Sequence, residues 1–595
     1  MAVPDQDTVN TLLEKVGEGK SCIVDQVDVA RSLEREGRAS NAMKALASLG
    51  ADHGRNVERD LHRWVEGLLG RPVQPYYLHL KLESNTSFEL EDVDVPVIPP
   101  YEFAHILMHF DEAQFRRSFL DPEGPSCLEF WTYAKTTEWG KAHIALQGAS
   151  DEKLSKMLPI VWHMDGFEVH SNAEHYAWSC ESILSSSDLW ECKLPVAIIP
   201  HRRMQLKQTR KKVFKVMAEF IGFVMRIWCI GLLPPLGFYN ESLHHRALEP
   251  NTEIARGWTT AFAGLKGDAK ARREMHNYKR HYNSTFLCED CLACQWFKNA
   301  PKHLYYGDFG DGAFHKKTRI SHDVYVASEL QLTPWLSVPG WHKSLNYRDL
   351  LHDVWIGFGK DVAASSINEC LKEKLFGEGS TDRCLKRLTI IRDRWCKKQG
   401  ISKVPLAFTQ CNCGLPGTST GGEKKKKYAE LSSQFKGMHV KVICKFLASF
   451  LHRLPQPDVH AKIRAACLWS LVDFFHVLDH AGLILDDAQV ARASRAGKLF
   501  LQSYQWLAGN AARAQRTDWH LRPKLHSFDH VVDNLQNRLN PVKVQCAGDE
   551  TYMGILKKVG RRCHGSNTML RTLQRVVLGM SLRFRRYLAL MQSPI

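Results

Sequence analysis

The sequence predicts a mixed α/β protein that carries a large, mostly helical insertion. Three observations predict this class. Three strand-like segments follow one another closely, at about residues 158–169, 177–184 and 191–200. An amphipathic helix over 209–233 then leads to a fourth strand-like segment at 258–265. Between about 361 and 528, apolar residues recur at helical spacing in long runs, at 440–451, 463–478 and 488–507.

The chain before the first of these strands is predicted to be mainly helical. Apolar residues recur at helical spacing between about 9 and 69, which is typical of a small helical bundle. The density of Arg and Lys there leaves a DNA-end-binding domain as the alternative. Residues 76–97 alternate weakly, become acidic and run into Pro96, which is typical of a linker. Residues 103–119 are predicted to form one amphipathic helix.

These patterns divide the chain into four segments. We expect a mainly helical N-terminal region at 1–150 and the first part of an α/β core at 151–360. A helical insertion at 361–535 and C-terminal helices at 536–595, which complete the core, should follow. The composition allows a real core, because 44% of the 595 residues are hydrophobic and 24% are charged.

The charge balance and the number of cysteines indicate which partners and which redox compartment to expect. Lys and Arg number 80 against 64 Asp and Glu, a net charge of +16 that favours a polyanionic partner. The most apolar stretch, 213–235, contains Lys215, Glu219 and Arg226 and therefore predicts a buried helix, so no membrane partner is expected. The first ten residues are polar, unlike a signal peptide, and 17 scattered cysteines suit a reducing compartment.

Three carboxylates occupy informative places in this pattern. Asp165 follows the apolar run 158–161 inside a predicted strand, and Asp268 directly follows the fourth strand. A buried carboxylate costs several kcal/mol unless a cation binds it, which favours a metal; the alternative is a strand-edge acid beside a turn at Gly166. Glu550 begins a predicted helix on which Lys557 and Arg561 share its face.

The start of that last helix leaves two assignments open. Asp549 and Glu550 compete for the role of the third acid. Alternatively, Asp549 caps the helix and Glu550 is a solvated acid favoured by the helix dipole.

The cysteine cluster at Cys288, Cys291 and Cys294 has the spacing of a zinc site. Three thiolates would leave one position for a ligand from elsewhere, and the alternative is a set of buried, reduced cysteines. The candidates for the remaining ligand are five nearby histidines: His276, His281, His303, His315 and His322.

Short motifs in this region resemble those of CACTA and Plavaka-type DNA transposases, of which the chain looks like a divergent relative. The segment from Gly267-Asp268 to Cys288-x-x-Cys291 resembles their second-acid block, and Asp349-Leu-Leu-His352 resembles a later motif. The helix from Gly548 to Arg561 is similar to their final acid-bearing helix. The segment 523–526, followed by a second histidine at 530, resembles a Pro-Lys-x-His segment of related transposases.

The resemblance implies a ribonuclease-H-like core and cutting and joining of DNA strands. Asp165, Asp268 and Glu550 would hold two Mg²⁺ (or Mn²⁺) ions about 3.5–4 Å apart. Asp349, His352 and Asp549 are candidates for catalytic support. The implied partner is double-stranded DNA, as element ends and target, with the nucleus as location and a homo-oligomer left open. The alternatives are a domesticated, inactive DNA-binding derivative and a cytosolic zinc-binding interaction protein.

Basic residues cluster beside two of these acids and are predicted to hold the DNA backbone. Those beside Asp268 are Lys266, Lys270, Arg272 and Arg273, and those after Glu550 are Lys557, Lys558, Arg561 and Arg562. A separate run of four lysines at 424–427 is either a solvated loop, a nuclear import signal or a further backbone contact.

Overall fold

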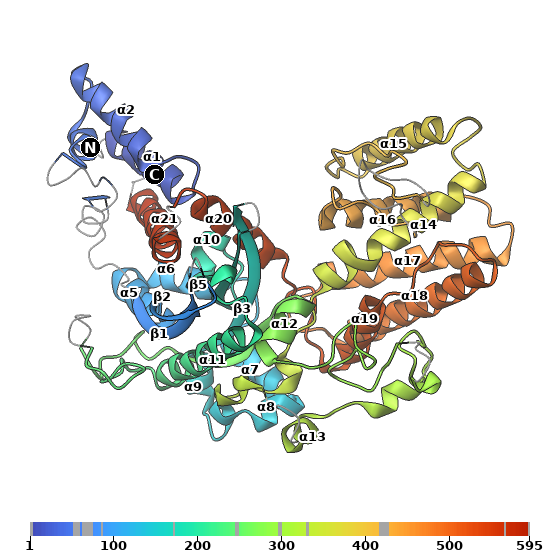
Figure 1. Ribbon diagram of the computed structural model, residues 1–595, viewed down its shortest axis with the longest axis horizontal. Helices are drawn as coiled ribbons and strands as arrows, with labels where there is room; N and C mark the ends of the chain where they lie inside the picture. The colour runs from blue at the N-terminus through green and yellow to red at the C-terminus, as the bar shows by residue number, and fades with distance from the viewer. Residues whose placement is uncertain are drawn as a thin grey trace. The chain divides into compact units, whose positions relative to one another are not determined.

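The computed structural model covers residues 1–595. It describes all of them except 1–3, 52–56, 58–59, 62–74, 85–86, 171–172, 244–248, 296–299, 329–332, 416–427, 564–566 and 593–595. The lysine run at 424–427 therefore lies outside the described residues. The chain divides into two compact units (Figure 1). The sheet unit comprises 1–277, 331–346 and 547–595, and the helical unit comprises 278–330 and 347–546.

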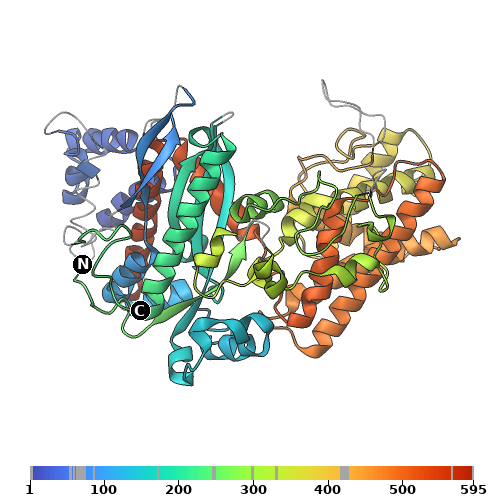
Figure 2. The ribbon, with the colours of Figure 1, turned by 60° about the horizontal axis from the view of Figure 1, so that its bottom comes forward.

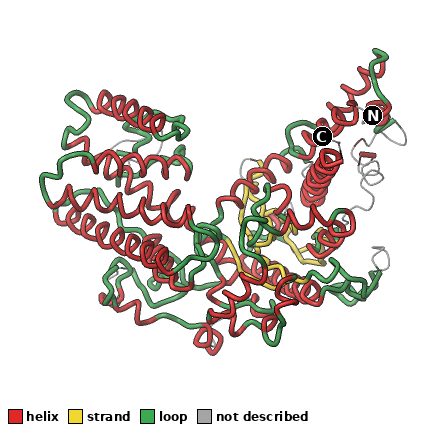
Figure 3. Tube along the Cα trace, turned by 180° about the vertical axis from the view of Figure 1, so that it is seen from behind, coloured by secondary structure: helices red, strands yellow, loops and turns green. Residues whose placement is uncertain are grey.

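The sheet unit is built on one six-stranded mixed sheet with the order β1-β2-β5-β4-β3-β6. β3 (Met157–His170), β4 (Ala173–Ser182) and β5 (Leu194–Pro200) are antiparallel neighbours. β6 (Thr259–Lys266) lies parallel to β3 on its other side. The predicted α/β class and the four predicted strands are therefore confirmed. All six strands, drawn yellow in Figure 3, belong to this unit.

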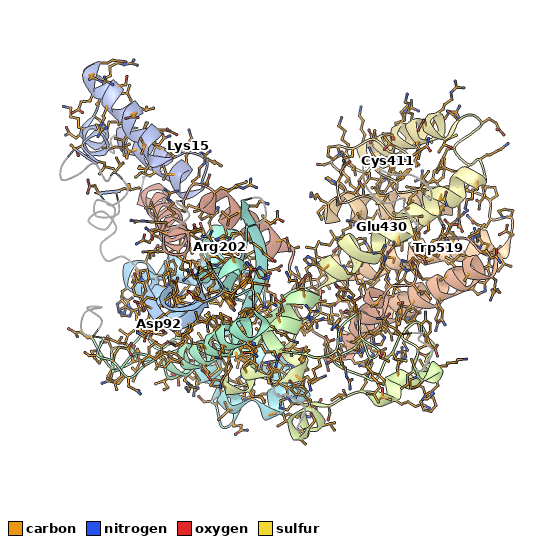
Figure 4. The ribbon with its side chains drawn as sticks, viewed as in Figure 1. Lys15, Asp92, Arg202, Cys411, Glu430 and Trp519 are labelled. Carbon is orange, nitrogen blue, oxygen red and sulfur yellow. The ribbon has the colours of Figure 1, made fainter. Side chains whose placement is uncertain are left out.

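The predicted linker at 76–97 is wrong, because this segment forms a hairpin of the sheet. β1 (Tyr76–Glu83) alternates between buried and exposed residues and pairs antiparallel with β2 (Leu90–Val97). The acids of β2 project into solvent, where Asp92 (Figure 4) lies 3.4 Å from Lys81. Only the last residues of β2 are buried. Its exposed acidic part therefore lacks the alternation of apolar and polar residues by which a strand is predicted.

Helices cover both faces of the sheet. Because residues paired across antiparallel strands point to the same side, Met164 and Trp178 share one face and His163 and Ser179 share the other. α11 (Lys207–Ile230) packs Phe214 against Trp178 and so covers the first face (Figure 2). α20 (Ala547–Gly560) lies on the second face along β3, and α21 (Thr568–Gln592) packs beside it.

The N-terminal helices form the predicted small bundle as far as the structure describes them. α1 (Pro4–Gly17), α2 (Ile23–Arg35) and α3 (Asn41–Ala47) share an apolar core with Leu578 of α21. The predicted single helix over 103–119 is instead two helices, α5 (Pro100–Phe110) and α6 (Glu112–Phe119). Asp111 separates them, since its side chain accepts the backbone N–H of Ala113 and caps α6. Three shorter helices follow: α7 (Cys127–Thr136), α8 (Glu138–Ala142) and α9 (Asp151–Ser155).

The helical unit packs its helices around one large apolar core. The core includes Phe358, Phe474, Phe500 and Phe528, whose rings contact one another. The three predicted helical runs are confirmed as α16 (Gly437–His452), α17 (Val459–His480) and α18 (Asp487–Arg513). The other long helices of the unit are α14 (Gly359–Lys372), α15 (Thr381–Lys398) and α19 (Pro523–Asn534). Among the described residues, no helix combines the length and apolar character needed to cross a membrane.

Candidate metal centre and candidate active site

Four buried side chains in the helical unit converge on one point. Cys288 and Cys291 come from a loop, and His526 and His530 lie one turn apart on α19. Sγ of Cys288 lies 3.3 Å from Nε2 of His530, and Sγ of Cys291 lies 3.3 Å from Nε2 of His526. The two Nε2 atoms are 3.1 Å apart. All four ligand atoms lie within 4.8 Å of one another, so they could hold a metal ion.

The spacing of these atoms fits a tetrahedral ion. Zinc with Zn–S bonds of about 2.3 Å and Zn–N bonds of about 2.0 Å separates sulfur and nitrogen ligands by about 3.5 Å. The loop also provides backbone hydrogen-bond donors for the two sulfur atoms. The backbone N–H groups of Asp290 and Ala293 point at Sγ of Cys288 and Cys291, over 3.3 and 3.4 Å respectively. Arg280 fixes the loop by donating to the carbonyl oxygens of both cysteines.

The electrostatics of the pair favour one ionised thiol. Burial would raise the pKa of Cys288, but a hydrogen bond from Cys291 and the nearby His530 and His526 bring it well below its ordinary value. The hydrogen bond to Cys288 and burial raise the pKa of Cys291. Arg348, also buried, donates to Sγ of Cys288 over 3.7 Å, which places a positive charge beside the thiolate.

The predicted ligand set needs correction at two points. Cys294 is not part of the group, because its thiol points to the carbonyl oxygen of Pro301, 3.3 Å away. None of the five histidines proposed from sequence completes the set. His276, for example, bonds through Nδ1 to Thr333 in the sheet unit. The histidines that do complete it follow the cysteines by more than 230 residues. Their signal in the sequence was two histidines four residues apart, at 526 and 530.

A second group borders the metal centre. His315, His526 and Asp529 bring their ligand atoms within 4.8 Å of one another, and all three are buried. Asp529 is already engaged, since Nζ of Lys316 lies 2.8 Å from its carboxylate. Asp529 and Lys316 therefore form a charged layer around His526, of the kind that commonly surrounds metal ligands.

In the sheet unit, the pairing of β3 with β6 brings the segments of Asp165 and Asp268 to the same end of the sheet. His163 pairs with Lys266, the last residue of β6; Asp165 lies two residues further along β3, and Asp268 lies two residues beyond the end of β6. Asp268 still has extended backbone angles and caps α12 (Ala269–His276). The two segments approach closely at Gly267, where a Cβ would lie 3.2 Å from the carbonyl oxygen of Met164.

The alternation of side chains places Asp165 on the face that α20 covers. His163 and Lys266 both contact Asp549 of α20, so Asp165, two positions after His163 on β3, points to the same face. α20 then follows β3 to Val169, which a Cβ at Gly560 would contact at 3.2 Å. Glu550 lies in the first turn of this helix, at the end nearest His163.

Asp549 belongs to a buried charge network rather than to an exposed site. Its carboxylate lies 2.8 Å from Nζ of Lys266 and also binds Lys193, and both lysines bind Glu181. Burial alone would raise the pKa of Asp549, but His163, Lys193 and Lys266 hold it far below its ordinary value. With two lysines and two carboxylates the network is neutral when the histidine is uncharged. Asp549 is therefore engaged by two lysines, and the role of Glu550 as the third acid stays a prediction.

The three remaining acids are half-buried. Oδ1 of Asp165 accepts the N–H of Gly166 at 2.7 Å, and Oδ1 of Asp268 accepts the N–H of Ala271 at 2.6 Å. A carboxylate has a second oxygen beyond the one so used. Within the described part of the chain, these three acids are not among the groups whose ligand atoms all lie within 4.8 Å.

The basic residues predicted to hold DNA fall into buried and exposed sets. Lys266 and Arg272 are buried, so neither side chain is placed for a phosphate, and the prediction is wrong for both. Lys270 pairs with Glu174, and Arg273 lies 3.9 Å from Glu274. On α20, Lys557 lies 3.8 Å from Glu168, and Arg561 donates to the carbonyl of Val169. Lys558 and Arg562 are exposed.

Asp349 and His352 belong to the helical unit. The carboxylate of Asp349 accepts the N–H groups of Leu351, His352 and Cys546 and pairs with the His352 ring. Although burial opposes this, these contacts lower its pKa. Both residues therefore make structural contacts inside their own unit.

Comparison with protein-family models and with curated protein sequences gives no match. The two sites thus rest on the residues and their geometry. The network around Asp549 was missed in the sequence because its lysines and acids are separated along the chain and carry no common spacing.

Proposed function

We propose that this protein is a metal-dependent DNA transposase-like enzyme with a ribonuclease-H-like core. Three antiparallel strands, a helix and a fourth strand parallel to the first match the order expected for that core. The sheet supports this with β5-β4-β3 antiparallel, α11 across one face, and β6 parallel to β3. The helical unit, inserted between Asp268 and Glu550, corresponds to the helical insertion of related transposases.

One observation carries the proposal. Support comes from the register of β3 with β6, which brings the segments of Asp165 and Asp268 to the same end of the sheet, and from α20, which begins at that end and carries Glu550 in its first turn. Three half-buried carboxylates from separate elements form a donor set suited to hard cations such as Mg²⁺ or Mn²⁺. Such ions supply charge stabilisation to phosphodiester displacement when bound. The protein would hold Asp165 on β3, Asp268 at the start of α12 and Glu550 at the start of α20, and the network of Asp549 fixes α20 against β3.

The proposal includes one structural zinc ion in the helical unit. Cys288, Cys291, His526 and His530 would hold it and fasten the loop that carries the two cysteines to α19. This site is closed by four protein ligands, as structural zinc sites are, so it takes no part in the chemistry. The proposed partner is double-stranded DNA, and the proposed location is the nucleus.

The test combines cutting with metal mapping. Supercoiled plasmid is incubated with the full chain and Mn²⁺, and bound Fe²⁺ is used separately to cleave the backbone near its ligands. Asp165→Asn, Asp268→Asn and Glu550→Gln should each abolish nicking and Fe²⁺ cleavage near residues 165, 268 and 550. Glu168→Gln is the matched control, because Glu168 is an exposed acid on the same strand. Nicking that persists unchanged in all three variants would refute the proposal. Duplex binding without any metal at the acids would identify an inactive, DNA-binding derivative instead.

A further inference from the structure

α15 is fastened to the helical unit along one side only. Leu385 and Leu388 are fully buried in the apolar core, and Trp395 contacts Phe446 edge to face and donates to the Ser449 hydroxyl at 3.1 Å. Arg392 is buried on the same side and donates to two backbone carbonyls. These contacts fix the rotation of the helix, and therefore fix which residues face solvent.

The opposite side of α15 carries a row of cations. Positions 383, 386, 390, 394 and 397 are spaced by three or four residues and lie on one helical face. Four of them are the exposed side chains of Arg383, Lys386, Arg394 and Lys397, and the fifth is Ile390, 51% exposed. Lys398 adds a fifth exposed cation at the edge of the row. We call these five cations the α15 row.

Helix stability does not account for the α15 row. In the part of the chain that the structure describes, none of its five side chains makes an ion pair, whereas other exposed cations of the unit do. Lys374 pairs with Glu378, Arg492 with Asp473 and Lys498 with Asp311. Like charges three or four residues apart on a helix destabilise it.

The helix dipole also opposes part of the row. Lys397 and Lys398 lie in the last turn, where cations are favoured. Arg383 lies in the first turn after the cap Ser380, where the dipole is positive and cations are disfavoured. A binding partner that supplies negative charge along the helix would remove both costs.

We propose that the α15 row is a docking surface for the phosphate backbone of duplex DNA. From Arg383 to Lys397 the helix rises about 21 Å, at 1.5 Å per residue. One strand of B-DNA presents about six phosphates over that length. These exposed side chains have no acid partner among the described residues, which suits contact with the phosphate backbone rather than with base edges. This surface rests on the proposed function, since it gives the helical unit a role in holding the DNA that the carboxylates act on.

The test measures binding of the full chain to a labelled 30-base-pair duplex by fluorescence anisotropy across a range of NaCl concentrations. The variant combines Lys386→Ala, Arg394→Ala and Lys397→Ala. The matched control combines Lys374→Ala, Arg492→Ala and Lys498→Ala, which removes the same charge from paired, exposed positions of the same unit. Far-UV circular dichroism and thermal unfolding verify that both proteins fold as the wild type does.

The row variant should bind at least about tenfold more weakly, and its slope of log K against log salt should be shallower by about 3, close to 0.9 per lost contact. The control should keep the wild-type slope.

Equal losses of affinity in both variants would show an effect of net charge alone and overturn the inference. An unchanged affinity of the row variant would also overturn it. If wild-type protein nicks plasmid yet the row variant binds normally, only this inference fails. If wild-type protein binds no duplex, both this inference and the proposed function fail. Binding of the row to anionic vesicles but not to DNA would also overturn it.

Discussion

Zinc removal gives the sharpest prediction from the helical unit. Cys288→Ser takes one ligand from the four-residue group, whereas Cys294→Ser changes the same residue type six positions further on. Both side chains are buried, but only Cys288 lies in the group. We therefore expect one zinc per chain in the wild type and in Cys294→Ser, and weak or no zinc binding in Cys288→Ser.

The size of the effect follows from linkage. An ion that binds only the folded form stabilises it by about 4 kcal/mol when its free concentration is a thousandfold above Kd. The helical unit has about 250 residues. A unit of that size loses about 2–4 °C of Tm per kcal/mol, so chelation should lower its Tm by about 8–16 °C. Local protection should fall most in the loop at 278–330 and in α19, which the ion joins.

The assay combines metal analysis of purified protein, calorimetry with and without chelator, and hydrogen exchange. Chelation should leave the Tm of Cys288→Ser unchanged, because that variant has no ion to lose. Finding no zinc in wild-type protein would refute the assignment. Equal zinc loss in Cys288→Ser and Cys294→Ser would refute the ligand set.

Four further predictions concern the sheet unit. Asp165→Asn should abolish Mn²⁺-dependent nicking while leaving duplex affinity equal or tighter, because it removes a negative charge near the phosphates. Asp549→Asn should lower the free energy of unfolding in urea by about 3–5 kcal/mol, since it leaves buried lysine charge uncompensated; a loss below about 1 kcal/mol would contradict the network. Burial lowers the pKa of His143 to about 4. Below pH 6.5 the side chain of His143 is therefore protonated in the unfolded chain but neutral in the folded chain, which lowers the free energy of unfolding by about 2 kcal/mol between pH 8 and pH 5. Over this pH range the His143→Gln variant should lose about 2 kcal/mol less stability than the wild type. Lys558→Ala with Arg562→Ala should make the salt slope of duplex binding shallower by about 2, and an unchanged slope would exclude that end of α20 from the DNA surface.

Local patterns in the sequence predicted the elements that bury a regular face. The apolar segments at 158–169 and 258–265 and the helical runs from 440 to 507 all form the elements expected of them. Side-chain periodicity reports burial within a few residues, so it succeeds where one element packs one continuous face. It failed at 90–97, because the acids of β2 face water and only the partner strand reveals the hairpin.

The candidate sites also combine features that the sequence predicts with features that only the fold reveals. Sequence spacing singled out Cys288 and Cys291, which do converge, whereas the choice of Asp165 and Asp268 from their order along the chain stays a prediction. The sequence offered no means to connect the cysteines with His526, because that contact joins residues 235 positions apart. The ligand set depends on how α19 packs against the loop, and only the fold decides that.

The adjacent residues Asp549 and Glu550 show where sequence information ends. The sequence determined that an acid lies at the start of the last core helix, since the residue types and the helical pattern are local properties. Successive residues of a helix point about 100° apart, so the rotation of α20 against β3 decides which acid is buried. Lys193, directly before β5, and Lys266, at the end of β6, fix that rotation by binding Asp549. Only the tertiary structure decides which of the two acids is buried, because the charges that stabilise the buried carboxylate come together only after the sheet has formed.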